Sequence, residues 1–337
     1  MDTNLATIQV VSELNPIPNA DAIEVASMKG IGWKCVVKKN EFRIGDLGVY
    51  ISIDTIVPDK PEFEFLRNKS FKVKTIRLRG QISQGLLLPL SVLPANDYKE
   101  GQDLTSVLNI THYEKPIPEN MRGEIQGQFP SSYVPKTDEI MAQSILPVLN
   151  EIMGKEVYIT VKCDGTSATF ANIEGTIRVC SRNLSLKESE SNVYWKMYRK
   201  YNIDKALADV PNYAIQGEIC GAGIQKNKLG LTETKLFVFD VYDIKSGKYL
   251  NYNDRVDFCG NYGLETVPLL SVCQFGFTLE QLLEMAKGKY DSGKNREGIV
   301  IRPVVEAYSP TIDSLYGRAG RMSFKVLNND FLEKDED

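Results

Sequence analysis

At 337 residues, the chain is long enough for two domains or one large one with a well-formed apolar core. Hydrophobic residues make up 42% and charged residues 25%, as in ordinary soluble globular proteins, and a net charge of −4 does not by itself favour nucleic acid. The single histidine, His112, excludes a histidine-rich metal site and disfavours Ser-His or Cys-His catalysis. Any chemistry must therefore depend on Lys, Arg, Asp and Glu, which suits phosphoryl transfer with a divalent metal.

Residues 5–93 alternate short β-type runs with turn residues. The expected strands are residues 7–11, 22–27, 33–38, 48–53 and 71–78. Short strands without long helices predict a small β-barrel, and we expect an OB-fold module over residues 1–105.

A run of cations occupies residues 67–79, which contain no acidic residue. Its members are Arg67, Lys69, Lys72, Lys74, Arg77 and Arg79. The run could be a charged edge strand that discourages aggregation, or a nucleic-acid-binding face that contacts phosphates. The expected barrel favours the second interpretation.

Residues 106–130 have little apolar periodicity and predict a linker to a second domain over residues 131–337. A helix capped by Thr137 or Asp138 is expected to run to residue 152, with Pro147 able to bend it. Residues 157–161 alternate apolar and polar side chains, which predicts a half-buried strand. Further strands are expected at 178–180, 214–219, 236–242, 298–302 and 323–326, and helices at 188–200 and 279–287. Strands and helices mix without a βαβ rhythm, which predicts an α+β domain built on antiparallel sheets with flanking helices.

The sequence Lys162-Cys163-Asp164-Gly165 follows the strand expected at 157–161. Asp164 and Gly165 predict a tight turn into a returning strand at 166–170. Lys162 could act as a nucleophile if its pKa falls well below its ordinary value of about 10.4, and nearby cations or a metal would lower it. Alone, the pattern is weak, because a lysine that ends a strand is usually just solvated.

Further motifs follow in order along the chain. They are Ser181-Arg182-Asn183, Gln216-Gly217-Glu218, the strand around Phe239, Glu297 at the start of a β run, and Ser323-Phe324-Lys325-Val326. Each has a plain alternative, since Glu218 and Glu297 could be surface ends of strands and Phe239 could be a core residue. The ordered series is much harder to assign to chance than any single member.

This order of motifs resembles that of the covalent nucleotidyltransferases, which include RNA ligases, DNA ligases and capping enzymes. Segments 16–21, 80–85, 135–139, 217–221 and 323–326 are similar to the ATP-dependent RNA ligase branch with an N-terminal OB module, typified by the Naegleria and Deinococcus enzymes. Because few residues follow Lys325, we expect no C-terminal OB domain of the kind found in DNA ligases and capping enzymes.

The resemblance implies ATP and Mg or Mn as cofactors. Lys162 would attack the α-phosphorus of ATP to form lysyl-AMP, and Lys325 would meet the α-phosphate. Asp164, Glu218 and Glu297 would hold the metal. Phe239 would stack on adenine. The implied nucleotide site is completed by Lys136, Gly165 and Arg182.

Two positions depart from the related ligases. Met141 stands where an Arg is expected, and Ser323 stands where a Lys is frequent. Both departures remove positive charge from the triphosphate side, so we expect weaker use of ATP in the first step. Arg318 or Arg321 could compensate.

The expected function is sealing of 5′-phosphate and 3′-hydroxyl ends, at nicks in duplexes, by an intracellular (cytoplasmic) monomer with no membrane contact. The six cysteines show no zinc spacing and are expected to be free thiols. The expected partners are ATP and RNA or an RNA-containing nicked duplex. The alternatives are a nucleic-acid-binding protein with an inactive nucleotidyltransferase domain, another polynucleotide ligase, or a capping-type enzyme.

Overall fold

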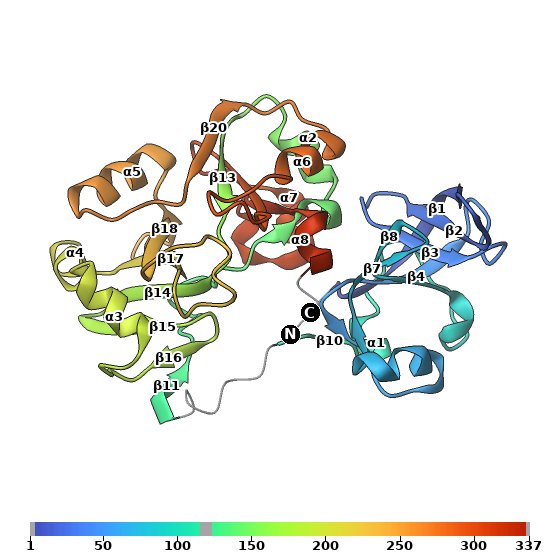
Figure 1. Cartoon of the computed structure of the whole chain (residues 1–337), viewed down its shortest axis with the longest axis horizontal. Helices are drawn as coiled ribbons and strands as arrows, with labels where there is room; N and C mark the ends of the chain where they lie inside the picture. Colours follow the sequence, from blue (N-terminus) through green and yellow to red (C-terminus); the bar gives the residue numbers. More distant parts are fainter. Residues whose placement is uncertain (1–3, 115–122, 335–337) are drawn as a thin grey trace.

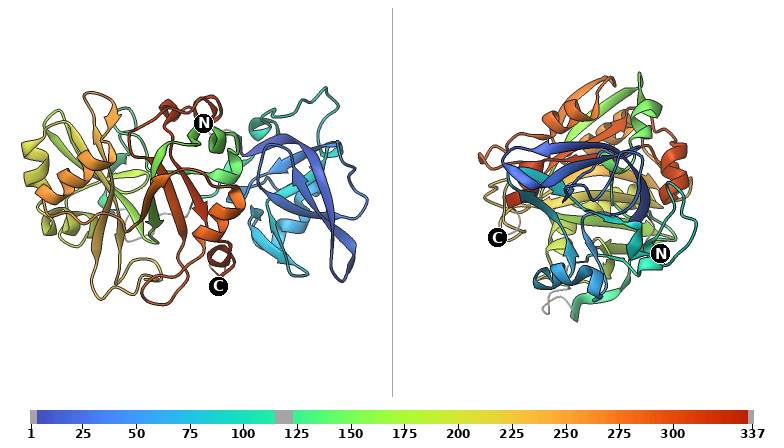
Figure 2. Two further views of the ribbon diagram at one scale, coloured as in Figure 1. Left: turned by 90° about the horizontal axis from the view of Figure 1, so that it is seen from above. Right: turned by 90° about the vertical axis from the view of Figure 1, so that its right-hand side faces the viewer.

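The computed structural model describes residues 4–114 and 123–334. Figures 1 and 2 show three bodies in a row: an N-terminal lobe, a central five-stranded sheet with its helices, and a seven-stranded sheet at the far end. The central sheet therefore lies between the N-terminal lobe and the larger sheet.

The N-terminal lobe is an antiparallel β structure. Its main sheet has the order β3-β2-β1-β4-β9, formed by β1 (Ala6–Ile17), β2 (Ala20–Met28), β3 (Lys34–Lys38), β4 (Leu47–Ile51) and β9 (Leu86–Pro89). The smaller pairings involve β5 (Thr55–Ile56), β6 (Lys72–Val73), β7 (Thr75–Leu78), β8 (Gln81–Gln84) and β10 (Thr111–His112). The helical turns are η1 (Pro61–Lys69), η2 (Leu90–Val92) and α1 (Thr105–Leu108).

The central sheet has the order β12-β22-β21-β13-β20 and is antiparallel except for the parallel pair β12–β22. Its strands are β12 (Ile140–Met141), β13 (Glu156–Lys162), β20 (Leu269–Gln274), β21 (Gly298–Pro303) and β22 (Phe324–Leu327). The helical segments of this part of the chain are η4 (Ala142–Ser144), α2 (Pro147–Ile152), α6 (Leu279–Ala286), α7 (Pro310–Tyr316), η5 (Arg318–Gly320) and α8 (Asn329–Lys334).

The far sheet has the order β11-β16-β15-β14-β17-β18-β19. Its strands are β11 (Ile125–Gln128), β14 (Thr166–Ile173), β15 (Thr176–Cys180), β16 (Leu184–Leu186), β17 (Tyr213–Cys220), β18 (Lys235–Asp243) and β19 (Lys248–Tyr249). Helices α3 (Val193–Lys200), α4 (Ile203–Asp209) and α5 (Tyr252–Asn261) pack on it through one apolar cluster. The α+β class with antiparallel sheets and flanking helices is confirmed.

Several expected elements have different bounds. The strand expected at 71–78 is split, because β6 pairs with β5 whereas β7 pairs with β8. The helix expected to start near residue 137 is wrong: α2 begins only at Pro147, whose missing N–H and fixed φ suit the first helical turn. Helix α3 begins at Val193, because the Asn192 side chain caps it. The capping box that begins at Thr278 is confirmed for α6.

Strand β13 is buried on both faces, so the expected half-buried strand is wrong. Val157 and Ile159 pack into the apolar cluster beneath the helices. Tyr158 and Thr160, on the opposite face, are each only 2% exposed. The reason is tertiary: Tyr158 packs on Tyr252 and bonds to Arg255 of α5, and Arg302, beside it in the sheet, pairs with Asp240 of the far sheet.

The range 106–130, expected as a linker, contains secondary structure at both of its ends. Strand β10 pairs with β5 of the N-terminal lobe, and β11 pairs with β16 of the far sheet. The domain limits at residues 105 and 131 remain a prediction.

The N-terminal lobe contacts the central part through the turn between β2 and β3. The Gly32 N–H donates to the Gln143 carbonyl at 2.8 Å, and the Trp33 indole N–H donates to the Ser144 hydroxyl at 3.0 Å. A Cβ at Gly32 would lie 2.3 Å from a methyl group of Leu279 and 3.4 Å from Cα of Gln143, so a side chain there would displace Leu279.

Buried ion pairs join the two large sheets. Arg302 on β21 lies 2.6 Å from Glu139 and 3.3 Å from Asp240 on β18. Arg321 also pairs with Asp240, at 2.7 Å, and with Glu306, at 2.8 Å. Burial alone would raise the pKa of Glu139 and Asp240, but the arginines outweigh it and hold the pKa of both carboxyls below their usual range.

This network predicts acid-sensitive stability. Because the folded-state pKa of Asp240 and Glu139 lies below the unfolded value of about 4, the stabilisation is complete above that pH and is lost as pH falls through the folded-state pKa. Asp240→Asn should lower the free energy of unfolding at pH 7 by about 3–5 kcal/mol, because it leaves buried arginines underpaired. Urea unfolding from pH 7 to pH 3 measures both effects.

Asp257→Asn, at an exposed carboxylate of α5, is the matched control and should unfold like wild type. An Asp240→Asn protein whose stability declined with acid as steeply as that of wild type would contradict the assignment.

Candidate active site

Lys162 lies where the chain passes from the central sheet to the far sheet. Strand β13 pairs with β20 and β21, whereas β14 pairs with β15 and β17. The strand expected at 166–170 is confirmed as part of β14 (Thr166–Ile173), but its expected return beside β13 is wrong, since β14 belongs to the other sheet. A Cβ at Gly165 would lie 2.3 Å from the Ile219 carbonyl oxygen and 2.9 Å from Cγ of Glu218. Glycine is required there because β14 starts against β17.

This crossing brings together groups from both sheets. The Lys162 Nζ lies 2.8 Å from Oε1 of Glu297, which directly precedes β21. Glu218, on β17, pairs in register with Ser167 at the start of β14. The amine and two of the carboxylates singled out in the sequence thus meet at the same end of the two sheets.

The electrostatics differ from the expectation for a free nucleophile. Burial opposes the charge on Lys162, but Glu297 and Glu218 outweigh it and raise the pKa of the amine. The expected depression of this pKa is therefore wrong for the site as it stands. Burial, together with the neighbouring Lys162 charge, instead lowers the pKa of Lys325.

The pKa of Glu218 is raised to about 8: burial raises it most, the charge of Lys162 lowers it, and the charges of Glu297 and Asp164 add to the rise. Mutual repulsion among carboxylates is what a divalent cation relieves, so these oxygen donors have the chemistry that suits Mg²⁺ or Mn²⁺, although their present arrangement does not form a metal site. Over residues 4–114 and 123–334, no group of three or more His, Cys, Asp or Glu side chains is arranged to hold a metal ion. Glu297 is paired with Lys162 instead.

Tyr290 connects the segments that carry the catalytic candidates, and the sequence did not reveal it. Its hydroxyl donates to the Lys162 carbonyl at 2.8 Å and accepts the N–H groups of Asp164 and Glu297, each at 3.1 Å. The side chain is 9% exposed, and burial raises its pKa. One neutral hydroxyl therefore fixes three backbone positions. A tyrosine between two lysine-rich turns gave no sequence signal.

Residues 135–139 form a strap across the ends of the strands, which we name the strap segment. Each of its residues makes a polar contact with a strand or an adjoining turn. The contacts are Pro135 O with Gln216 (2.9 Å), Lys136 with Asn183 (2.8 Å), Thr137 with Ser167 (2.5 Å), Asp138 with Arg182 (2.6 Å) and Glu139 with Arg302 (2.6 Å). Two expected nucleotide-binding residues, Lys136 and Arg182, are thus held by the same strap.

Phe239 is half-buried, although its neighbours Val238 and Asp240 on β18 are buried. The guanidinium carbon of Arg302 lies 5.8 Å from the centroid of its ring. A partly exposed aromatic on an otherwise buried strand is compatible with the expected base-stacking surface, which remains a prediction.

Met141 and Ser323, the two positions that differ from the related ligases, each contact a residue of the site or of the N-terminal lobe. Met141 pairs in register with Lys325, and it packs against the N-terminal apolar cluster that includes Trp33. The Ser323 hydroxyl accepts a hydrogen bond from Arg302 at 2.9 Å. Arg321, one of the two cations that could compensate, is paired with Asp240 and Glu306, and its role toward ATP remains a prediction. The side chain of Arg318 lies outside the described part of the chain.

The six cations of 67–79 do not form one charged edge strand. Arg67 and Lys69 lie in η1, Lys72 in β6 and Arg77 in β7. Arg67 is paired with Asp59 at 2.6 Å and with Glu64 at 2.7 Å. A nucleic-acid-binding role for this run, including Lys74 and Arg79, remains a prediction.

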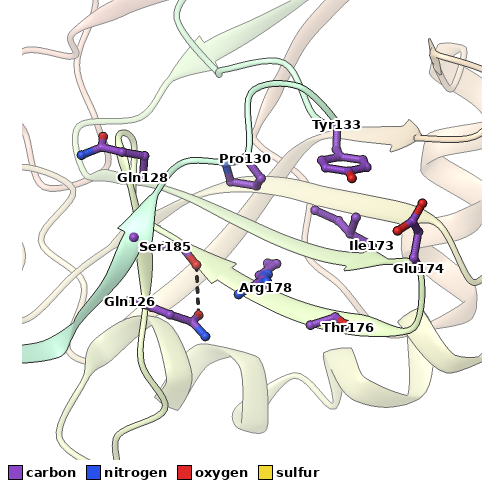
Figure 3. A pocket seen from close by; sticks show the side chains of 10 residues that line it. Gln126, Gln128, Pro130, Tyr133, Ile173, Glu174, Thr176, Arg178 and Ser185 are labelled. Carbon is purple, nitrogen blue, oxygen red and sulfur yellow. Dashed lines mark hydrogen bonds between the residues drawn. The ribbon is translucent and has the colours of Figure 1, made fainter.

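A cavity of about 440 Å³ lies beside β11 and the β14–β15 turn, away from the predicted catalytic residues. Figure 3 shows Arg178 and Tyr133 among its lining side chains, with a hydrogen bond from Ser185 to Gln126. None of the predicted site residues lines it. All six cysteines are free thiols, as expected.

Comparisons with known proteins agree with this architecture. An RNA ligase family model matches residues 155–327, and an OB-fold domain model matches residues 5–90, which confirms the expected N-terminal module. No curated protein gave a match. Within the described segments, no helix is long and apolar enough to cross a membrane.

Solved structures of Naegleria gruberi RNA ligase are similar over almost the whole chain. A mutant with ATP and Mn is 35% identical, with a TM-score of 0.86 over 98% of this chain and 99% of that chain. A mutant with AMP and Mn and a structure with pyrophosphate each give 35% identity and a TM-score of 0.86 over 98% of both chains. With a family model over half its length and relatives above 30% identity, the chain belongs to the RNA ligase family.

Proposed function

We propose that the chain is an ATP-dependent RNA ligase that joins 5′-phosphate to 3′-hydroxyl ends, at nicks in duplexes, through lysyl-AMP and an adenylylated 5′ end. The observation that carries this proposal is the Lys162 amine, 2.8 Å from Glu297 at the crossing between the two sheets. The Naegleria relatives with ATP, AMP and Mn support ATP and a divalent metal as its cofactors.

In the first step, the neutral Lys162 amine attacks the α-phosphorus, a P–N bond forms, and pyrophosphate leaves. Glu297, in contact with the Lys162 Nζ, is placed to orient the amine, and the proton that the amine loses passes to solvent. Lys325, with its lowered pKa, meets the α-phosphate and offsets its charge. The nucleotide is bound by Phe239, Lys136, Gly165 and Arg182.

Asp164, Glu218 and Glu297 would hold Mg²⁺ or Mn²⁺, which would neutralise phosphate charge and weaken the attraction between the carboxylates and the ammonium. The pKa of Glu218 is raised to about 8 chiefly by burial, so a bound cation would favour the ionised form of this carboxyl.

In the second step, an oxygen of the 5′-phosphate attacks the phosphorus of lysyl-AMP, and Lys162 leaves as the amine. In the third step, the 3′-hydroxyl attacks the 5′-phosphate, a phosphodiester forms, and AMP leaves. Lys162 is not the nucleophile in the third step, so the first and third steps can be tested separately.

Lys162→Ala should abolish sealing of a nicked RNA duplex with a 5′-phosphate, because no lysyl-AMP can form. The same variant should still seal a nick whose 5′ end is already adenylylated. Gel analysis of both substrates measures this difference, with Lys155→Ala, at an exposed lysine before β13, as the matched control. A variant that sealed 5′-phosphate nicks like wild type would overturn the proposal. Failure of wild type on both substrates would leave a binding protein with an inactive site.

Tyr290→Phe should slow lysyl-AMP formation by roughly tenfold or more and change the ATP KM much less. Removal of the hydroxyl leaves buried N–H groups without an acceptor, at a cost of about 1–3 kcal/mol each, and loosens the backbone at Lys162. Single-turnover kinetics measure the change. Tyr308→Phe removes an exposed hydroxyl bonded to Asp313 and should behave like wild type. Equal rates for the two variants would contradict the role of Tyr290.

Met141→Arg should lower the ATP KM or speed lysyl-AMP formation, because it adds a cation beside Lys325 in the strand register. Met141→Leu keeps the apolar contact with the N-terminal lobe and is the matched control. Initial rates at varied ATP concentration separate the two effects. If the arginine variant matches the leucine variant in both parameters, Met141 does not limit the use of ATP.

A further inference from the structure

A cationic pocket lies beside the catalytic crossing. Its volume is about 290 Å³, and its charged lining residues are Lys228, Lys289, Lys294 and Asp330. Three ammonium groups against one carboxylate give this lining a formal charge of +2, in a chain whose net charge is −4. Gly293, Asn295 and Phe331 complete the lining, which we name the lysine pocket.

Each wall of the lysine pocket is bonded to a catalytic segment. In the loop before Lys228, the Gln225 amide donates to the Gly165 carbonyl at 3.3 Å. The turn that carries Lys289 and Lys294 contains Tyr290, whose hydroxyl holds Lys162 and Glu297. Helix α8 follows Asn328, whose N–H donates to the Glu297 carbonyl at 2.9 Å. The pocket is therefore attached to the reaction centre from three sides.

The walls also fix one another. The Ser292 hydroxyl donates to the Lys228 carbonyl at 2.5 Å, and the Tyr290 N–H donates to the Lys294 carbonyl at 2.9 Å. The Lys228 Nζ lies 3.5 Å from the centroid of the Phe331 ring, which holds this cation over α8. The pocket thus presents its charges on connected walls, which lowers the cost of ordering them when an anion binds.

We propose that the lysine pocket binds backbone phosphates of the polynucleotide that flanks the break. This proposal rests on the proposed function and names the surface through which that substrate is held. Lysine ammonium groups bind phosphate as point charges and carry no sequence information, which suits an enzyme that seals breaks in many sequences. Unlike Arg67, these lysines directly adjoin the catalytic segments.

The phosphate chemistry has two sources, the polynucleotide backbone and the β- and γ-phosphates of ATP. The backbone is favoured because the proposed nucleotide residues Lys136 and Arg182 are held by the strap segment, which shares no residue with the lysine pocket. Helix α8, which carries Asp330 and Phe331 of the pocket, also contacts the N-terminal lobe, since the Gln84 amide donates to Asn329 at 3.3 Å. A duplex on this surface would contact both the reaction centre and the lobe.

The test is equilibrium binding of a fluorescein-labelled nicked RNA duplex, by anisotropy, over a series of salt concentrations. K228A/K289A/K294A should raise Kd by tenfold or more at low salt and reduce the slope of log Kd against log salt by about 2–3, near one for each lost phosphate contact. K228R/K289R/K294R, which keeps the charges, should bind like wild type. K205A/K245A/K248A removes three exposed lysines elsewhere and is the control for net charge.

Unchanged Kd and salt slope in the alanine variant would overturn the proposal, as would equal losses in the distant-lysine control. Calorimetric titration with pyrophosphate tests the second source: loss of pyrophosphate affinity without loss of RNA affinity would assign the pocket to ATP and overturn the proposal. The binding assay does not depend on sealing. A wild-type protein that bound RNA through these lysines but sealed no nick would contradict the proposed function and leave the assignment of the lysine pocket intact.

Discussion

The buried pairing of Arg302 with Glu139 and Asp240 determines how the two large sheets face each other. A buried guanidinium is tolerated only when carboxylates neutralise it, and here one carboxylate comes from the strap segment and the other from β18 of the far sheet. Sliding one sheet against the other would separate these charges in a dry environment. The ion pairs therefore constrain the position of one sheet on the other more sharply than apolar packing could.

The arrangement of the active site follows from that constraint. Lys162 and Glu297 belong to the central sheet, and Glu218 to the far sheet, so the distance from amine to carboxylates depends on how the sheets are joined. Tyr290 adds a local constraint, because its hydroxyl bonds to the backbone on both sides of the crossing. Positioning of this kind contributes to catalysis by removing the entropy cost of assembling reactive groups.

The electrostatic state of the site has a consequence for the order of binding. With Glu297 against its amine, Lys162 is a poor nucleophile, since the carboxylates raise the pKa of the ammonium. Positive charge added near these carboxylates lowers the pKa of Lys162 and so increases the fraction of neutral amine. If Lys162 is the nucleophile that we propose, we expect it to react only after charged ligands have bound.

Local patterns predicted the strands and the capped helix well. The alternation around Ile159 and the capping box at Thr278 are properties of short segments, and the structure has both elements. Long-range features were predicted poorly. The burial of Thr160, the passage of β14 into a different sheet after Gly165, and the role of Tyr290 depend on residues that are far away in the sequence. The order of the motifs indicated which residues lie near Lys162, but it did not indicate which strands pair or which side chains contact one another.

Lys162 is the residue that we propose takes AMP from ATP. This assignment can be tested by incubation of the protein with ATP and Mg²⁺, followed by tandem mass spectrometry under conditions that preserve a phosphoramide. We expect one adenylyl group, labile in acid, on the peptide that contains Lys162, and no such group after incubation with GTP. An adduct on another residue, or a sealing-competent protein that forms none, would contradict it.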